Sequence, residues 1–393
     1  MKRIIFLITT LILSLTSMAE PPVVQLLTAS PGRDIYELEG HTALRIIHPV
    51  WGDFVVNWGV FDFDSPGFVY RFVKGETDYI AAAYPTDRFI ASYARDGRTL
   101  RYQTLRLDSI QAERLTTMVM ENLKPENRVY RYNYVLDNCV TRPLDMINQC
   151  IGTPVTLAPS TLGEKESSSF RNVMRHYHSN YPWYQFGIDT ALGSGIDRRL
   201  TADEPRFAPV VAFDMIQGAK LPSGEPLVAQ NGYLFGSETT PAAVAPPTHW
   251  TLTPLFWGWT VFALAFCVSI LQTRGKKKWG RIFDTVYFSL MGLEGLVLTF
   301  LIFVSVHEAT SPNWLYLWLN PLCFIGAVTP WLKHGKVLEI SYQSVNFALL
   351  ITLMVIFMAG VQSPNPAFIP LIMASGYRAI TDIIYPLCAK KRS

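Results

Sequence analysis

A cysteine and a histidine are the residues of this chain whose types and positions suggest covalent chemistry. Cys139 lies in LDNCVTRPLD, directly after Asp137 and Asn138, two residue types that often cap a helix start. A thiol at a helix start faces unpaired backbone N–H groups and the positive end of the helix dipole, which favour the nucleophilic thiolate and can hold an oxyanion. We therefore predict a nucleophile at Cys139; the alternative is a buried, inert thiol that fills a gap in the core.

A cysteine nucleophile needs a base, and His41 is the best placed of the seven histidines. His41 opens a predicted strand in EGHTALRI, whereas the others lie in loops, a turn or a linker, or on a helix surface in the case of His176 and His178. A histidine on a strand that faces a cysteine at a helix start is the arrangement of papain-like thiol enzymes. Here the histidine precedes the cysteine, which is a circularly permuted order.

The residue that orients His41 depends on the loop of a predicted hairpin, formed by HTALRIIHPV and DFVVNWGVFDF. With a two-residue turn, Asp62 or Asp64 shares the face of His41, whereas a three-residue loop or a bulge gives that face to Asn57. We favour Asn57, by analogy with Cys-His-Asn enzymes. The alternative roles are a solvated turn for the two aspartates and a backbone cap for Asn57.

Two charged residues follow Cys139 on the same predicted helix. Arg142 is our candidate for binding a phosphate headgroup, and the alternative is a surface pair with Asp145. No group of residues has the spacing of a metal site, so we expect neither a metal nor a cofactor.

The elements that must position these residues form an α+β domain with a small antiparallel sheet. TLRYQTLRL predicts a further strand, and helices are predicted from Asp108, over 139–150 with Gly152 as the stop, and in SSSFRNVMRHYHSNY. On the second of these helices, Cys139 and Cys150 are about 16 Å apart. That distance is too long for a disulfide, so we expect a free thiol.

The composition indicates a membrane protein with a soluble part. Hydrophobic residues make up 49% of the chain and charged residues only 17%, against roughly 25% in an average soluble protein. Residues 1–19 have the basic start, apolar run and small-residue site of a signal peptide, and an uncleaved anchor is the alternative. The soluble part has no basic run interleaved with aromatic residues, which argues against nucleic acid.

The C-terminal part carries five apolar stretches, each near the ~20 residues needed to cross a bilayer. They are residues 255–271, 285–306, 314–332, 345–361 and 368–387. Lys and Arg lie in alternate loops and at the C-terminus, which predicts that these loops and the C-terminus are cytoplasmic and that the N-terminal domain lies on the outer face. We therefore predict an exported domain over 20–240, a linker over 241–254 and a five-helix bundle over 255–389. Arg378 and Asp382, inside the last stretch, are spaced to pair.

Four blocks of this sequence resemble the Lnb N-terminal periplasmic domain family of Bacteroidota. They are GHTALRI, NWGVFDFDSPGFVYRFVKG, YRYNYVLDNCVTRPLD and PWYQFGIDTALGSGID. The resemblance covers most of residues 25–235 and implies that His41 is the base and Cys139 the nucleophile of a permuted thiol-enzyme fold, similar to NlpC-type and lecithin:retinol acyltransferase-type enzymes. Glu39 departs from the apolar or aromatic residue expected before Gly40.

The resemblance also implies a location and an activity. The location is the bacterial inner membrane, with residues 20–240 as a periplasmic catalytic domain, and full-length members resemble lipoprotein N-acyltransferases. A phospholipid would donate an acyl chain to Cys139, and the α-amine of a diacylated lipoprotein would accept it, without a cofactor. The alternatives are a cell-wall thiol amidase or peptidase, a phospholipase of the same fold, or a membrane sensor in which the thiol-enzyme fold has lost activity.

Overall fold

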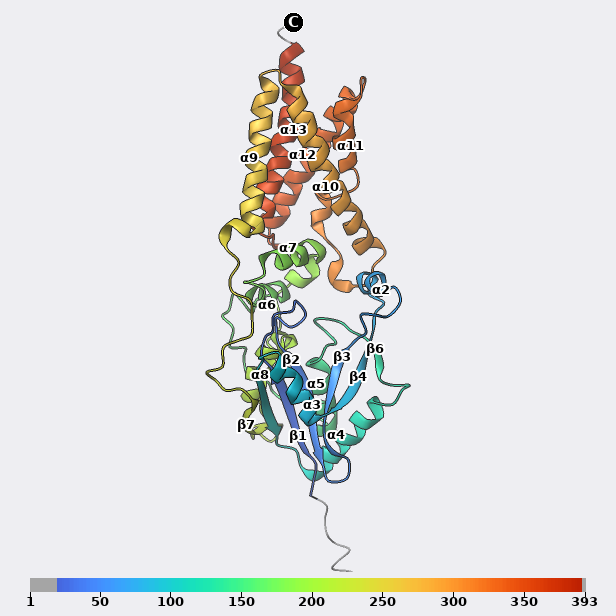
Figure 1. The fold of residues 1–393 in the computed structure, drawn as a ribbon, viewed down its shortest axis with the longest axis vertical. Coiled ribbons are helices and arrows are strands. Elements are labelled where there is room, and N and C mark those ends of the chain that lie inside the picture. Colours follow the sequence, from blue (N-terminus) through green and yellow to red (C-terminus); the bar gives the residue numbers. More distant parts are fainter. Residues whose placement is uncertain (1–19, 391–393) are drawn as a thin grey trace, which may run out of the picture.

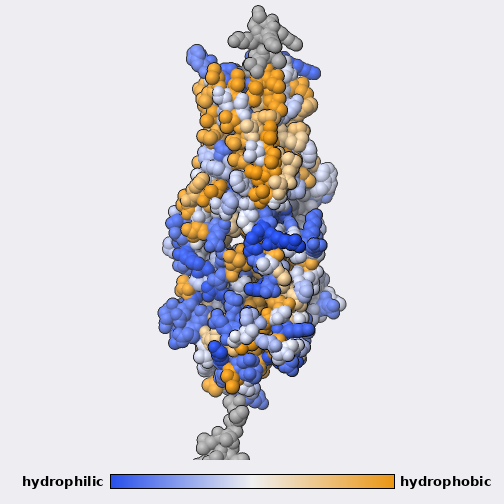
Figure 2. Space-filling view, turned by 180° about the vertical axis from the view of Figure 1, so that it is seen from behind, coloured by the Kyte–Doolittle hydropathy of each residue, from blue (hydrophilic) through white to orange (hydrophobic). Residues whose placement is uncertain are grey.

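The sheet domain and a helical bundle lie end to end along the long axis of the molecule (Figure 1). The structure is a computed structural model that describes residues 20–390, except for the side chains of 385–390. The predicted signal peptide, residues 1–19, lies outside the described residues and stays a prediction. The surface of the bundle is largely apolar, whereas hydrophilic side chains are gathered over the sheet domain (Figure 2).

Seven antiparallel strands form one sheet in the order β6-β4-β3-β2-β1-β5-β7. The strands are β1 (Val23–Ala29), β2 (His41–His48), β3 (Gly52–Val60), β4 (Asp78–Pro85), β5 (Leu100–Leu105), β6 (Val129–Arg131) and β7 (Val228–Phe235). The predicted mixture of helices and a sheet is present, but the sheet is larger than expected. Its edge strand β7 comes from the far end of the domain and closes on β5, a long-range pairing that local sequence patterns do not indicate.

The predicted hairpin is β2–β3, and its loop has three residues. His48 pairs with Gly52 and Leu44 with Val56, so residues 49–51 form the loop. The His48 ring nitrogen Nδ1 accepts the N–H groups of Val50 and Trp51, at 3.0 and 3.2 Å, which stabilises this loop. Of the two registers that the sequence left open, the structure has the one that gives Asn57 the face of His41.

Helices cover both faces of the sheet, which places the main core between β2–β3 and α4–α5 (Figure 1). The helices of this domain are α2 (Phe68–Lys74), α3 (Thr86–Arg95), α4 (Ser109–Asn122), α5 (Thr141–Ile151), α6 (Phe170–Tyr177), α7 (Pro182–Ala191) and α8 (Pro209–Gln217). Short 3-10 helices are η1 (Ser194–Asp197) and η2 (Glu204–Phe207). The predicted cap of α4 is confirmed, because the Asp108 carboxylate accepts the Gln111 N–H at 2.8 Å and the Gln111 side chain accepts the Asp108 N–H.

The bundle has three helices that are long and apolar enough to cross a membrane among the described residues. These are α9 (Pro254–Thr273), α10 (Lys277–Phe303) and α12 (Lys336–Met358), and α13 (Phe368–Lys390) packs beside them. Among the described residues, three of the five predicted spans therefore correspond to a helix that meets these criteria. The stretch 314–332 is divided into η5 (Trp314–Leu317), α11 (Cys323–Val328) and η6 (Thr329–Trp331), because Pro321 and Pro330 interrupt it. The remaining short elements are η3 (Trp250–Leu252) and η4 (Glu308–Thr310).

A buried arginine joins three helices of the bundle. Arg378 of α13 contacts Asp382 at 3.2 Å, as predicted, and also donates two hydrogen bonds of 2.6 Å to Asp284 of α10. It bonds Ser269 and Gln272 of α9 as well, at 2.7 and 2.8 Å. Sequence spacing showed the partner on the same helix but not the one on α10. A buried charge with this many partners is best read as a structural connection.

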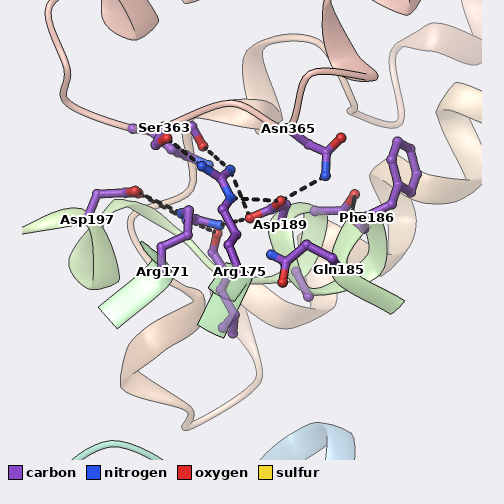
Figure 3. Close-up of polar contacts among 12 residues, drawn as sticks. Arg171, Arg175, Gln185, Phe186, Asp189, Asp197, Ser363 and Asn365 are labelled. Carbon is purple, nitrogen blue, oxygen red and sulfur yellow. Dashed lines mark hydrogen bonds and ion pairs between the residues drawn. The ribbon is translucent and has the colours of Figure 1, made fainter. Parts of the chain in front are cut away.

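A second buried network fixes the sheet domain to the bundle (Figure 3). Arg171 of α6, 0% exposed, pairs with Asp189 of α7 at 2.9 Å and with Asp197 of η1 at 2.8 Å. Asp189 also accepts a 2.8 Å bond from Asn365, in the loop between α12 and α13. Arg175 extends the network to that loop through the hydroxyl of Ser363. We call these six side chains the α6–α7 junction.

The chain after β3 contacts the bundle at a different place. The Val306 N–H, just after α10, donates to the Lys74 carbonyl of α2 at 2.8 Å, and the Ser305 hydroxyl donates to the Val73 carbonyl at 2.9 Å. Together with the α6–α7 junction, this contact holds the sheet domain at two separate points. The end of the sheet where β2 begins therefore faces the bundle (Figure 1).

Candidate active site

His41 is the first residue of β2, at the end of the sheet nearest the bundle. Its Nε2 lies 2.5 Å from Oδ1 of Asn57 on β3. An amide oxygen only accepts, so Nε2 carries the proton and Nδ1 is left as the base. The turn into β2 requires Gly40, which has φ +84°; a Cβ there would lie 2.5 Å from the Ala29 carbonyl oxygen.

Asn57 reaches His41 because of the local shape of β3. The β2–β3 ladder stops at Leu44 and Val56, and a register shift follows between Asn57 and Val60 in the pairing with β4. Such irregularities redirect side chains at the ends of strands. The strand irregularity and the three-residue loop together bring the predicted histidine and asparagine into contact.

Cys139 lies beside the start of β2. It is 5% exposed, and its thiol is approached by the N–H of Thr42, by its own N–H and by the Tyr132 hydroxyl. Since Thr42 follows His41 directly, the thiol and the imidazole belong to the same small region. The structure thus brings together the three residues predicted to carry the chemistry.

The Cys139 thiol and the His41 imidazole are both neutral at pH 7. Desolvation lowers the pKa of His41 to about 4, although the hydrogen bond with Asn57 acts in the other direction. Burial raises the pKa of Cys139 to about 11, although the Thr42 N–H and the Tyr132 hydroxyl lower it. The expectation of a thiolate at a helix start was therefore wrong, because burial outweighs the helix end. The site is arranged for general-base activation of a thiol.

The side chain of Asn138 occupies the helix start that Cys139 was expected to use. Helix α5 begins at Thr141 and not at the predicted residue 139. Asn138 Oδ1 accepts the N–H groups of Val140 and Thr141 at 2.9 and 3.1 Å, and its Nδ2 donates to the carbonyls of Tyr134 and Phe207. Asn138 therefore accepts the N–H groups of the first residues at the start of α5 and holds the loop that carries the thiol.

Arg142 does not lie with the catalytic pair. Its Nε and Nη2 donate to the Asp137 carboxylate at 2.6 and 2.7 Å, and its guanidinium lies 3.5 Å from the centre of the Tyr130 ring. The predicted surface partner, Asp145, is not its partner in the structure. These contacts give Arg142 a role in fixing the loop, and its predicted contact with a phosphate remains untested.

The two aspartates that were alternatives to Asn57 lie in the turn before α2. The Asp64 N–H donates to the Asp62 carboxylate at 2.9 Å, and both side chains are exposed. Asp62 and Asp64 therefore lie in a solvated turn, the alternative to orienting His41.

Three residues near the thiol were not among the predicted site residues. Tyr132 supplies its hydroxyl to Cys139, and Tyr134 bonds Glu39. His178, expected at the surface of α6, is 1% exposed and lies 3.2 Å from Glu39. The alternation of tyrosines in YRYNYVLDNC was the one local signal for the first two, since the residues of an extended segment point alternately to two sides.

Comparison with known families matches both halves of the chain. Residues 16–173 match the Lnb N-terminal periplasmic domain, and residues 247–391 match the Lnb transmembrane domain. The chain belongs to the Lnb family. No curated protein and no solved structure matches it.

In this Lnb chain, the family match gives a location to each part. The sheet domain corresponds to the periplasmic domain, and the bundle corresponds to the transmembrane domain. The periplasmic match includes His41, Asn57 and Cys139 and ends before α7. No group of three or more possible metal ligands lies together among the residues that the structure describes. Cys139 and Cys150 are both free thiols, as predicted.

The contact between His41 and Asn57 leads to a prediction for this Lnb chain. We expect Asn57→Ala to lower kcat for acyl transfer by roughly 100-fold, because a misoriented base loses about that much. KM should stay within about twofold, because Asn57 does not bind substrate in this account. Steady-state kinetics of the full chain in detergent micelles would measure both values. Asp64→Ala is the matched control and should keep kcat; a loss there comparable to that of Asn57→Ala would mean that Asp64 orients the base.

Proposed function

We propose that this Lnb-family chain is a lipoprotein N-acyltransferase that carries the acyl group as a thioester on Cys139. The observation that supports this most is the position of the Cys139–His41–Asn57 group, at the end of the sheet that faces the transmembrane bundle. The donor is a phospholipid, and the acceptor is the α-amine of the diacylglyceryl-cysteine at the N-terminus of a lipoprotein. The residues present need no cofactor for this chemistry.

In the first half-reaction, His41 Nδ1 takes the thiol proton while the sulfur of Cys139 attacks the ester carbonyl. The carbonyl oxygen becomes an oxyanion, and the donors around the thiol are the N–H groups of Thr42 and Cys139 and the Tyr132 hydroxyl. The C–O bond then breaks, and His41 gives its proton to the leaving alkoxide. The products are a thioester and a lysophospholipid. The contact between the base and the thiol tightens when the substrate binds.

In the second half-reaction, a neutral amine attacks the thioester. His41 takes a proton from the attacking nitrogen and passes it to the sulfur as the C–S bond breaks. The products are an amide and the free thiol. Transfer of the acyl group from an ester to a thioester and then to an amide requires no ATP. This suits a reaction on the periplasmic side of a membrane, where ATP is absent.

The docking of the sheet domain favours lipid substrates over the alternatives. Contacts at α2 and at the α6–α7 junction hold the catalytic end toward the bundle, where lipid esters are within reach. A cell-wall amidase has no need of this orientation, and one anchor would serve it. A phospholipase shares the first half-reaction and differs only in passing the acyl group to water.

A direct test of this function is to incubate the purified full chain with phospholipid and no acceptor, and to measure its intact mass. We expect one acyl group to be added, to be removed by hydroxylamine, and to be mapped to Cys139. Adding a diacylated lipopeptide should then return the protein to its original mass and leave an N-acylated peptide. Release of free fatty acid with no peptide product would support the phospholipase instead.

The neutral pair leads to a pH prediction for the first half-reaction. The base works while His41 is neutral, so its activity is lost only as the pH falls through about 4, and the thiol stays protonated up to about 11. Single-turnover release of lysophospholipid should therefore be level between about pH 5.5 and 9. A rise in rate with a midpoint near 6.5, the value of an ordinary histidine, would contradict this assignment.

A further inference from the structure

A second group of titratable side chains lies next to the active site and has no part in the mechanism above. Its centre is Glu39, two residues before His41 and 8% exposed. Tyr134 donates its hydroxyl to Glu39 Oε2, and Glu39 Oε1 lies 3.2 Å from Nε2 of His178. The other ring nitrogen of His178, Nδ1, lies 2.8 Å from Gln185 Oε1. This carboxylate is the departure from the expected family pattern noted above.

Three buried atoms of this group lack hydrogen bonds among the described residues, and one of them is Nε2 of Gln185. Glu39 Oε1 and His178 Nε2 are buried, and within the described residues neither has a hydrogen bond of good geometry, although they face each other. Buried polar atoms without partners are unfavourable and uncommon, and each one needs a reason. A binding partner that arrives with the substrate is one such reason.

The position of Glu39 makes it part of the surroundings of the thiol. Burial is the main cause of the raised pKa of Cys139 and of Tyr132, and the negative charge of Glu39 adds to it in both. Tyr134 is 39% exposed, so its ring forms the side of the group that meets solvent. A cation that approaches the thiol along this side would meet an aromatic face first and the carboxylate next, the pair of features that favours ammonium groups.

In the second half-reaction, the acceptor ammonium must lose one more proton than His41 transfers. An α-amine with a pKa of roughly 8 is mostly an ammonium at neutral pH and has no lone pair with which to attack. His41 passes on one proton, from the attacking nitrogen to the sulfur. The additional proton of the ammonium needs a different acceptor close to the thiol.

We propose that Glu39, supported by His178, receives the primary ammonium of the lipoprotein acceptor and takes its extra proton before attack on the thioester. The N–H bond breaks, Glu39 becomes protonated, and the freed lone pair attacks the carbonyl carbon. Glu39 later releases the proton to solvent. This inference rests on the proposed acyl transfer and adds a site that selects amine over water. A donor with an ethanolamine headgroup also carries a primary ammonium, so the test must separate the two sources.

The test compares Glu39→Gln with the unaltered full chain in two separate reactions. The first is lysophospholipid release, without acceptor, from phosphatidylethanolamine and from phosphatidylglycerol. The second is transfer from the preformed thioester to a diacylated lipopeptide, followed from pH 6 to 9. We expect thioester formation within about threefold for both donors, and transfer lowered about 100-fold at pH 6.5, the range for losing one acid–base group. The deficit should shrink above pH 8, where the free amine is present.

The other outcomes overturn the proposal in different ways. A loss in the first reaction with phosphatidylethanolamine alone would assign the ammonium to the donor. An equal loss in both reactions, or a transfer deficit that does not depend on pH, would mean that Glu39 only supports the fold. If the unaltered chain forms no thioester, the proposed function itself fails, and this inference fails with it.

Two further variants make the result specific. Glu39→Asp keeps the carboxylate and should restore much of the transfer at pH 6.5. Glu113→Gln is the matched control, because Glu113 also faces a buried histidine, with His48 Nε2 at 3.3 Å, but at the opposite end of β2. It should leave both reactions unchanged, and a comparable transfer defect there would contradict a local role for Glu39.

Discussion

Cys139→Ala is expected to lower kcat for N-acyl transfer by roughly 10⁶-fold, the scale seen when the nucleophile of a catalytic triad is removed. The reason is that no other described thiol lies beside His41, whereas the sulfur of Cys139 is surrounded by the donors that an acyl-transfer transition state needs. The measurement is transfer of a radiolabelled acyl chain from phospholipid to a diacylated lipopeptide by the purified full chain.

Cys150→Ala provides the control for a lost buried thiol. Cys150 is 3% exposed and belongs to the same core, and its thiol donates to the Ile147 carbonyl at 3.1 Å, away from His41. This variant should keep activity within about twofold and lose about 1 kcal/mol of stability, as for a small core truncation. Comparable activity losses in the two variants would show that packing, and not nucleophilic attack, explains the effect of Cys139.

Asp189→Ala is expected to have the largest effect on stability, about 3–5 kcal/mol, which is typical when one partner of a buried ion pair is removed. Arg171 would keep Asp197, but its Nη1 would lose its carboxylate in a site with no access to water. Asn365 would lose its partner across the junction. The measurement is the free energy of unfolding of the full chain in micelles, with proteolysis of residues 241–254 as a report on undocking.

The control for this prediction is an exposed ion pair in the same domain. Arg198 pairs with Glu204, and their side chains are 47% and 23% exposed. Glu204→Ala should change the free energy of unfolding by no more than about 1 kcal/mol. Equal losses in Asp189→Ala and Glu204→Ala would indicate that burial at the α6–α7 junction has no special role. If docking orients the active site, Asp189→Ala should also lower transfer to membrane-bound substrate more than transfer to a soluble lipopeptide.

The catalytic pair was predictable from the sequence because its signals are local. Cys139 beside Asn138, and His41 at the start of a strand, are short patterns, and the family blocks joined them. The third residue depended on loop length, which the sequence left open; the structure has three residues between His48 and Gly52.

The protonation state of the site was not predictable, because burial comes from residues far apart in the chain. The helix-start argument for a thiolate assumed free N–H groups, but the Asn138 side chain takes them, and the surrounding protein raises the pKa of Cys139. Likewise, His178 was placed at the surface because its helix is of mixed polarity. Its burial results from packing against Glu39, which is far away in sequence.

In the membrane part, too, long-range structure could not be predicted from average hydropathy. Average hydropathy and loop charge located the bundle, but not the break that leaves residues 314–332 without a helix long enough to count as a candidate span. The α6–α7 junction was also missed, since its charged residues lie on short helices and Asn365, the partner of Asp189 in the loop, is 176 residues further along the chain. Such long-range pairing leaves no periodic signal in the sequence.

The most direct test of the central claim is mass spectrometry of lipoprotein N-termini from cells in which this chain is the sole source of the activity. With the unaltered chain, the N-terminal diacylglyceryl-cysteine should carry an amide-linked acyl group. With Cys139→Ala at the same protein level, the same peptides should be diacylated and have a free α-amine. Triacylated peptides at normal abundance in the Cys139→Ala cells would contradict thioester-mediated acyl transfer by this protein.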